Sequence, residues 1–263
     1  GYDGIDMEAA TARGILVTRT PLVHVSTANH AIGLMFALVR KIPACDRGVR
    51  QGLWAERGRW LCPDLAGLTL GIIGFGKVGR EVAKRAQVIG MEVLAYDPLD
   101  PPGWSEAPRV ALRPLEELLM RADVVTVHAN ATRENRKMCG PEFFKTMKPG
   151  AYFVNCSRGS LVDEQALCDV LTSGKLAGAA LDVFAEEPPS PENSLLRLDN
   201  LVCTPHVGGD TTDVMRLSMQ MIERQIASVL RGQPPEHLLN PSVWGTARLH
   251  AHLKRTAPGN RRP

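Results

Sequence analysis

The stretch GIIGFGKVGREVAKRAQVIGMEVLAYDP, residues 71–98, decides the fold of this chain. An apolar run at 68–73 predicts a buried strand, and Gly74, Gly76 and Gly79 follow it in the pattern G-x-G-x-x-G. In such a loop the first glycine permits a tight turn and the second lets a diphosphate approach the backbone. The third allows helix and strand to pack closely. The pattern therefore predicts a phosphate-binding loop between a strand and a helix.

The residues after the loop complete a β-α-β unit. Apolar residues at helical spacing predict a helix over 77–87, ended by Gly90. Free N–H groups at the start of this helix would face the diphosphate. A second strand, 91–96, delivers Asp97, whose carboxylate can bind the adenosine ribose hydroxyls and would repel a 2′-phosphate. The alternative is a glycine-rich turn without a ligand, but the agreement of all four elements favours a dinucleotide site that prefers NAD.

Beyond residue 98 the predicted strands and helices keep alternating. Helices are predicted near 115–122, 142–147 and 163–173, and strands at 123–128, 151–155, 178–183 and 201–203. This alternation predicts an α/β fold with a Rossmann-type, doubly wound parallel sheet. Ligands bind at the carboxyl ends of the strands in such sheets, so the residues that follow each strand are the candidates for chemistry.

Three side chains at these strand ends could carry out a reaction. Arg158, Glu187 and His206 follow three different predicted strands. Arginine can bind a carboxylate with two parallel hydrogen bonds, and histidine can move a hydroxyl proton near neutral pH. A carboxylate on the second ring nitrogen would fix the tautomer of the histidine. Each residue alone has a structural alternative, such as a surface ion pair, a solvated acid or a cap, but together they fit the oxidation of a 2-hydroxy acid.

The composition fits a cytoplasmic enzyme. Of the 263 residues, 44% are hydrophobic, which is enough for a substantial core. The longest apolar stretch, 31–39, is far shorter than the about 20 residues that cross a bilayer. The six cysteines include no C-x-x-C pair, so neither a zinc site nor a disulfide framework is predicted. We expect no metal, no membrane partner and no nucleic acid.

The net charge of +3 is concentrated at the C-terminus. Segment 247–263 has no acidic residue and five basic ones, which are Arg248, Lys254, Arg255, Arg261 and Arg262. A basic tail can contact nucleic acid or an anionic membrane, but this one has two prolines, a glycine and no apolar periodicity. We expect a disordered terminus.

The order of the motifs resembles the D-isomer-specific 2-hydroxyacid dehydrogenases, the family of the D-3-phosphoglycerate, glycerate and D-lactate dehydrogenases. The resemblance runs from Gly1 to about Trp244. It is carried by GYDGIDMEAATARGILV (1–17), LTLGIIGFGKVGREVA (68–83), MKPGAYFVNCSRGSLVDEQAL (147–167), GAALDVFAEEPP (178–189) and NLVCTPHVGG (200–209). It implies an NAD-dependent oxidoreductase that acts on the CH–OH group of a D-2-hydroxy acid or on the matching 2-keto acid.

The resemblance also implies roles for single residues. Arg158 would bind the substrate carboxylate, His206 would be the acid/base, and Glu187 would be its partner. Gly1 would help Arg158 and His206 to hold the substrate. Asp182 would bond the nicotinamide carboxamide. The cofactor-binding residues implied are Gly74, Gly76, Lys77, Val78, Gly79, Asp97, Ala129, Cys156, Ser157, Arg158, Asp182, His206, Gly208 and Gly209.

The chain departs from the family pattern at three places. Gly4 stands where the family usually has asparagine, and Asn29 stands for the glutamate of an A-E-H motif that ends here in His30. Residues 129–132 read ANAT instead of LPLT. None of these is one of the three chemical residues.

The resemblance divides the chain into four parts. Residues 1–22 would be a remnant of a flavodoxin-like substrate domain, so the chain would be N-terminally truncated relative to the family. Residues 23–208 would form the NAD-binding Rossmann domain. Residues 209–246 would hold a C-terminal helix that returns to the substrate domain, and 247–263 would be the basic tail. A non-catalytic, NAD-sensing scaffold like the C-terminal-binding corepressors is an alternative function, and an inactive fragment is another.

A homodimer is also expected. Ser26 is predicted to cap a long helix over 26–42 that exposes an apolar stripe of Ile32, Met35, Phe36 and Val39. Part of this face must pack on the cofactor domain. In proteins that resemble this one, the helix and the following segment, with Trp54 and Trp60, embrace a second subunit.

Overall fold

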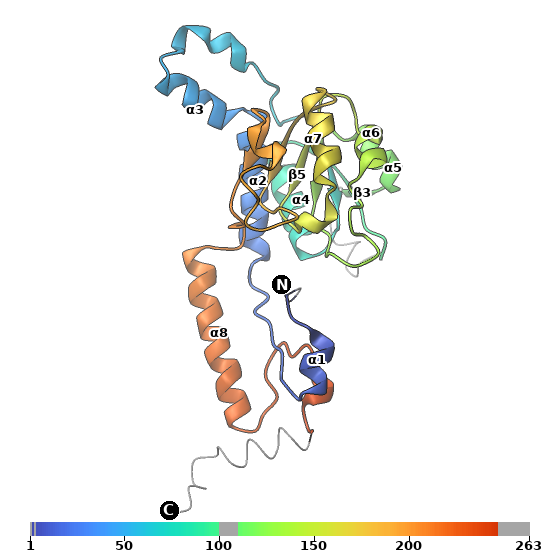
Figure 1. Cartoon of the computed structure of the whole chain (residues 1–263), viewed down its shortest axis with the longest axis vertical. Coiled ribbons are helices and arrows are strands. Elements are labelled where there is room, and N and C mark those ends of the chain that lie inside the picture. Colours follow the sequence, from blue (N-terminus) through green and yellow to red (C-terminus); the bar gives the residue numbers. More distant parts are fainter. Residues whose placement is uncertain (1, 3, 100–109, 247–263) are drawn as a thin grey trace, which may run out of the picture. The chain divides into compact units, whose positions relative to one another are not determined.

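The computed structural model describes residues 2, 4–99 and 110–246 (Figure 1). Gly1, which is expected to contact the substrate, lies outside the described residues. The tail 247–263, which is expected to be disordered, lies outside them as well. The chain forms two compact units. The terminal unit consists of Gly1–Val23 and Asp210–Pro263, and the sheet unit is His24–Gly209.

The sheet unit is built on seven parallel strands in the order β3-β2-β1-β4-β5-β6-β7. The strands are β1 Thr69–Ile73, β2 Glu92–Tyr96, β3 Val110–Leu112, β4 Val124–Val127, β5 Ala151–Asn155, β6 Leu176–Leu181 and β7 Leu201–Cys203. The chain moves outward from β1 in one direction through β2 and β3, and in the other through β4 to β7. The strand order therefore reverses between β1 and β4, which confirms the predicted doubly wound, Rossmann-type fold.

Helices cover both faces of this sheet (Figure 1). On one face α2 (His24–Val39) and α4 (Lys77–Ile89) pack on apolar side chains such as Leu70 and Ile72. On the other face lie α5 (Leu115–Arg121), α6 (Pro141–Thr146) and α7 (Glu164–Thr172). Both faces are thus apolar, so the strands read as continuous hydrophobic runs.

Helix α2 differs from its prediction in two ways. It begins at His24, so Ser26 lies in its first turn and the predicted cap is wrong. The predicted exposed stripe is also wrong, because Met35 and Val39 have no exposed surface and belong to the core under the sheet. Ile32 and Phe36 pack against the same core. The apolar face predicted from the sequence therefore packs in the core of the sheet unit.

A helical hairpin follows α2. It consists of α3 (Ile42–Arg50) and the 3-10 segment η1 (Trp54–Trp60), and it projects from the sheet (Figure 1). Lys41 Nζ donates to the carbonyl of Leu61 at 3.1 Å, which ties the two ends of the hairpin together. A Cβ on Gly48 would lie only 2.2 Å from the nearest atom of the Trp60 indole, so the ring packs directly on this glycine. Trp54 at the tip is 70% exposed.

The terminal unit joins residues from both ends of the described chain. It contains α1 (Met7–Ala12), α8 (Thr212–Leu230) and the 3-10 turn η5 (Pro241–Val243). Asn240, the N-cap of η5, bonds the segment that follows α1, because its side chain accepts from the Val17 N–H at 2.9 Å and donates to the Ile15 carbonyl at 2.8 Å. No helix in the described ranges combines the length and the apolar character that crossing a membrane requires.

Candidate active site

The glycine-rich loop leads from β1 into α4. Gly74 has φ +90°, and a Cβ there would lie 2.6 Å from the backbone nitrogen of Ala129. A Cβ on Gly79 would lie 2.3 Å from the carbonyl oxygen of Gly74. A Cβ on Gly76, in contrast, would meet no atom within 4 Å. The first and third glycines are therefore required by packing, whereas the second leaves an open space where a ligand can approach the backbone.

The start of α4 fits an anionic group. Gly76 is the N-cap and offers no side-chain cap, so the first N–H groups, those of Lys77 and Val78 among them, are available to a diphosphate. Asp97 follows β2 and lies beside the loop, because its carboxylate accepts from the Phe75 N–H at 2.8 Å. The glycine-rich loop and Asp97 thus adjoin, and this arrangement fits the diphosphate and ribose of a dinucleotide.

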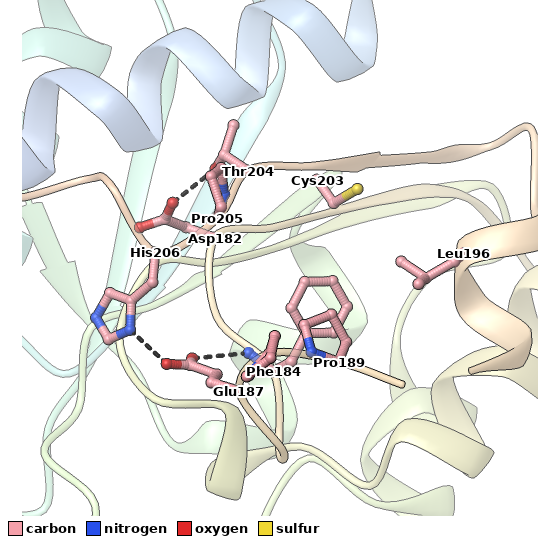
Figure 2. A pocket seen from close by; sticks show the side chains of 10 residues that line it. Asp182, Phe184, Glu187, Pro189, Leu196, Cys203, Thr204, Pro205 and His206 are labelled. Carbon is pink, nitrogen blue, oxygen red and sulfur yellow. Dashed lines mark hydrogen bonds and ion pairs between the residues drawn. The ribbon is translucent and has the colours of Figure 1, made fainter. Parts of the chain in front are cut away.

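His206 and Glu187 form a pair at the ends of β6 and β7 (Figure 2). Nδ1 of His206 lies 2.7 Å from Oε2 of Glu187. The other carboxylate oxygen, Oε1, accepts from the Phe184 N–H at 3.1 Å, so the glutamate is held from two sides. With Nδ1 engaged by a carboxylate, Nε2 is the ring nitrogen left for a substrate.

The backbone of His206 is also unusual. Its φ of +55° is in the left-handed region, where a residue other than glycine costs about 1 kcal/mol or more. The N–H of His206 donates to the carbonyl of Asp182 at 2.8 Å, which helps to hold the residue in this conformation. Such strain is concentrated at functional sites.

A pocket of about 380 Å³ opens beside the pair. Its wall is mostly apolar, and Figure 2 shows Phe184, Pro189 and Leu196 on the side away from the His206 ring. The lining residues are Asp182, Phe184, Glu187, Pro188, Pro189, Leu196, Cys203, Thr204, Pro205 and His206.

Arg158 lies at the end of β5, the neighbour of β6 in the sheet. One of its guanidinium nitrogens donates to the Ser157 carbonyl at 2.7 Å. The next residue, Gly159, begins the short 3-10 turn η3 (Gly159–Leu161) and packs directly on the backbone of Phe184. The segment that carries Arg158 is thereby joined to the loop that carries Glu187.

Asp182 is 2% exposed and sits at the end of β6. Its carboxylate accepts from the Thr204 hydroxyl at 2.6 Å, from the Val207 N–H at 3.0 Å and from the Gly208 N–H at 2.9 Å. Buried polar oxygens are costly unless they are hydrogen-bonded, and these three donors satisfy the carboxylate. Sequence reasoning found Asp182 but missed Thr204 and His30, whose contacts cannot be read from a local pattern.

The remaining candidates lie on the same sheet edge. Cys156 and Ser157 follow β5 and are buried, and burial together with the nearby charge of Asp182 raises the pKa of the Cys156 thiol far above its usual value. The Ser157 hydroxyl donates to Asn155 at 2.8 Å. Ala129 follows β4 against Gly74, and Gly209 ends the sheet unit.

Comparison with known proteins identifies the family. Residues 32–208 match the family model described as D-isomer specific 2-hydroxyacid dehydrogenase, NAD binding domain. The chain belongs to this family. The resemblance noted in the sequence and the NAD cofactor predicted from the glycine-rich loop are thus confirmed.

Relatives within the family differ in length. The chain is 45% identical over 245 residues to D-3-phosphoglycerate dehydrogenase of Archaeoglobus fulgidus, covering 92% of this chain and 46% of that protein. It is 39% identical over 249 residues to glyoxylate reductase of Korarchaeum cryptofilum, covering 92% of this chain and 74% of that protein. The chain thus spans about half the length of the first relative.

A solved structure from the family is similar in fold. D-lactate dehydrogenase of Aquifex aeolicus, complexed with NAD and lactic acid, aligns with a TM-score of 0.83 and 29% identity. The alignment covers 91% of this chain and 78% of that one.

Proposed function

We propose that this family member is an NAD-dependent oxidoreductase that acts on the CH–OH group of a D-2-hydroxy acid or on the matching 2-keto acid. The observation that carries the proposal is the pair of His206 and Glu187, with 2.7 Å between Nδ1 and Oε2. A carboxylate on Nδ1 fixes the tautomer that presents Nε2 to a substrate oxygen. The position of the pair after β6 and β7 is where ligands bind in such sheets.

In this mechanism each residue has one task. The nicotinamide held by these residues would supply the hydride acceptor for C2 of the substrate during oxidation and the hydride donor during reduction. During oxidation Nε2 of His206 takes the hydroxyl proton, and Glu187 stabilises the imidazolium that results. Arg158 binds the substrate carboxylate through its planar guanidinium, which orients C2. During reduction the same proton returns to the carbonyl oxygen.

The cofactor would be held by three groups of residues. Gly76, Lys77 and Val78 would bind the diphosphate at the N-terminus of α4, and Asp97 would bind the ribose hydroxyls. Asp182 would bond the carboxamide, with Ala129, Cys156, Ser157 and Gly208–Gly209 around the nicotinamide end. Because a 2′-phosphate would meet the Asp97 carboxylate, we propose a preference for NAD over NADP.

Turnover of NADH with a panel of 2-keto acids, glyoxylate and 3-phosphohydroxypyruvate among them, tests the function. His206→Asn keeps a side chain that tolerates positive φ but removes the base, so turnover should fall by about 10²- to 10⁴-fold. His237→Asn is the matched control, since His237 also has positive φ, at +53°, and is exposed. Equal loss in both variants would overturn the assignment.

Two further variants separate the roles of the other residues. Glu187→Gln should lower turnover moderately, because the neutral amide stabilises the imidazolium less. Arg158→Ala should mainly raise the substrate KM and leave NADH affinity near that of the parent. If the parent binds NADH but reduces none of the keto acids, the scaffold function is favoured instead.

We propose that residues 1–22 and 209–246 contribute to a substrate-binding domain and that residues 23–208 form the NAD-binding domain. Most of the proposed chemistry lies in the second of these parts. All six cysteines are free, including the exposed Cys203, which supports a reducing, cytoplasmic location.

We also propose a homodimer built on the α3–η1 hairpin. The hairpin exposes three large apolar side chains, those of Ile42, Val49 and Trp54, and Leu61 directly after it is exposed as well. Such a projecting apolar surface is typical of an association site. Sedimentation should give twice the chain mass at micromolar concentration, and Trp54→Ser should shift the equilibrium toward monomer. A parent protein that sediments as a monomer would contradict the proposal.

A further inference from the structure

His30 lies beside Asp182, the residue proposed above to bond the nicotinamide carboxamide. It projects from α2, and its Nε2 lies 2.9 Å from the Thr204 hydroxyl oxygen and 3.3 Å from Oδ1 of Asp182. The Thr204 hydroxyl donates its only proton to Oδ1 of Asp182, with 2.6 Å between the two oxygens. The threonine oxygen must therefore accept from His30, so Nε2 carries a proton.

The chain of donors ends on a single carboxylate. Oδ1 of Asp182 accepts from the Thr204 hydroxyl and the Val207 N–H, whereas Oδ2 accepts, among the described residues, from the Gly208 N–H alone. A carboxylate oxygen has two acceptor positions, so Oδ2 keeps one for a ligand. The donors on Oδ1 decide in which direction that position points.

Gly208 packs closely on this carboxylate and on the His30 ring. A Cβ on Gly208 would lie 2.8 Å from Oδ2 of Asp182 and 3.3 Å from Cδ2 of His30. The imidazole thus packs on the loop as well as donating to Thr204. A rotation of the carboxylate would break several bonds together.

We propose that His30 is a positioning residue for the nicotinamide end of the cofactor. Through Thr204 it orients the Asp182 carboxylate so that Oδ2 meets the carboxamide N–H. This inference rests on the proposed function, in which Asp182 binds the carboxamide. It adds a residue from α2, 152 positions earlier in the chain, to the control of nicotinamide geometry.

The test compares two ligands of the whole 263-residue chain. NADH reaches Asp182, whereas ADP-ribose has the diphosphate and ribose but no nicotinamide. His30→Leu removes the donor at similar size, so we expect the Kd for NADH to rise about tenfold. The Kd for ADP-ribose should stay within about twofold, since the glycine-rich loop and Asp97 are untouched. His30→Gln, which restores an N–H donor, should recover most of the NADH affinity.

Two more variants keep the test decisive. Thr204→Val removes the hydroxyl that connects His30 to Asp182, and it should cause the same selective loss even if His30→Leu fails to fold. The double variant should lose little more than either single one, because the two act in series. Asn29→Leu is the matched control on the same helix, since Asn29 bonds Arg85 of α4 instead, at 2.6 Å.

The outcomes distinguish a failure of the proposed function from a failure of the role proposed for His30. A parent chain that binds neither ligand contradicts the proposed function. A parent that binds NADH while His30→Leu and Thr204→Val bind it equally well overturns only the role of His30. Equal weakening of NADH and ADP-ribose, or the same selective loss in Asn29→Leu, would mean that the helix is displaced and would also overturn it.

Discussion

Gly159→Ala should disturb the proposed acid/base pair of Glu187 and His206 through the backbone of Phe184. A Cβ at this position would lie 1.9 Å from both the carbonyl carbon and the oxygen of Phe184. Ordinary contacts begin at 3.4 Å, so the Phe184 backbone must retreat by about 1.5 Å. Because these atoms are backbone, no side-chain rotation can relieve the contact.

The displacement has two calculable effects. Overpacking of this kind costs about 1–3 kcal/mol of the free energy of unfolding. The Phe184 N–H also donates to Oε1 of Glu187 at 3.1 Å, and a shift of this size would break that bond. Glu187 would then orient His206 poorly, and a 1 Å misplacement of a catalytic group can cost about 100-fold in rate.

Urea unfolding followed by circular dichroism, together with NADH turnover, measures both effects. Gly33→Ala is the control, because Gly33 lies within α2 and a Cβ there meets no atom within 4 Å. It should leave turnover unchanged and raise stability by about 0.5–1 kcal/mol. If Gly159→Ala unfolded at the urea concentration of the parent and kept its turnover, the contact with Phe184 would not hold the Glu187 loop.

Three further results are expected. Asp97→Ala should lower the ratio of NADH to NADPH affinity by at least about tenfold, as measured by nucleotide fluorescence, and an unchanged ratio would refute the ribose assignment. Gly79→Ala places a Cβ 2.3 Å from the Gly74 carbonyl oxygen and should abolish NADH binding while the far-UV spectrum stays native. Burial lowers the pKa of His128 from 6.5 to about 4, so the unfolded state binds the proton more tightly. Stability should therefore be complete above pH 6.5 and fall by up to about 3 kcal/mol as the pH drops toward 4, and His128→Leu should flatten this dependence in urea titrations.

Local patterns in the sequence predict most of the sheet. The strands at 151–155 and 201–203 have the predicted bounds, and the others are displaced by one or two residues at their ends. These strands are buried on both faces, so their apolar runs are continuous and easily recognised. Strand β3 was not predicted, since three half-buried residues at the edge of a sheet carry too little apolar signal.

Long-range side-chain contacts are harder to predict. Residues that follow parallel strands share one edge of the sheet, and on this basis the sequence predicts that Glu187 and His206 lie near each other. In the structure they are within hydrogen-bonding distance. No periodicity could show that His30 reaches Thr204, or that Gly159 lies against Phe184. Helix α2 shows the same limit, because the sequence marks Met35 and Val39 as one apolar face but does not say what covers them.

The confinement of the proposed machinery to residues 24–209 has a consequence for protein engineering. The glycine-rich loop, Asp97, Asp182, Glu187 and His206 all belong to the sheet unit, and the Glu187–His206 pair is made by two successive strand-end loops of it. In the proposed function, the sheet unit would carry the cofactor site and the proton-transfer residues together. Grafted onto the substrate-recognition part of another family member, it should bring its cofactor preference and proton transfer unchanged, while selectivity among acids follows the recipient.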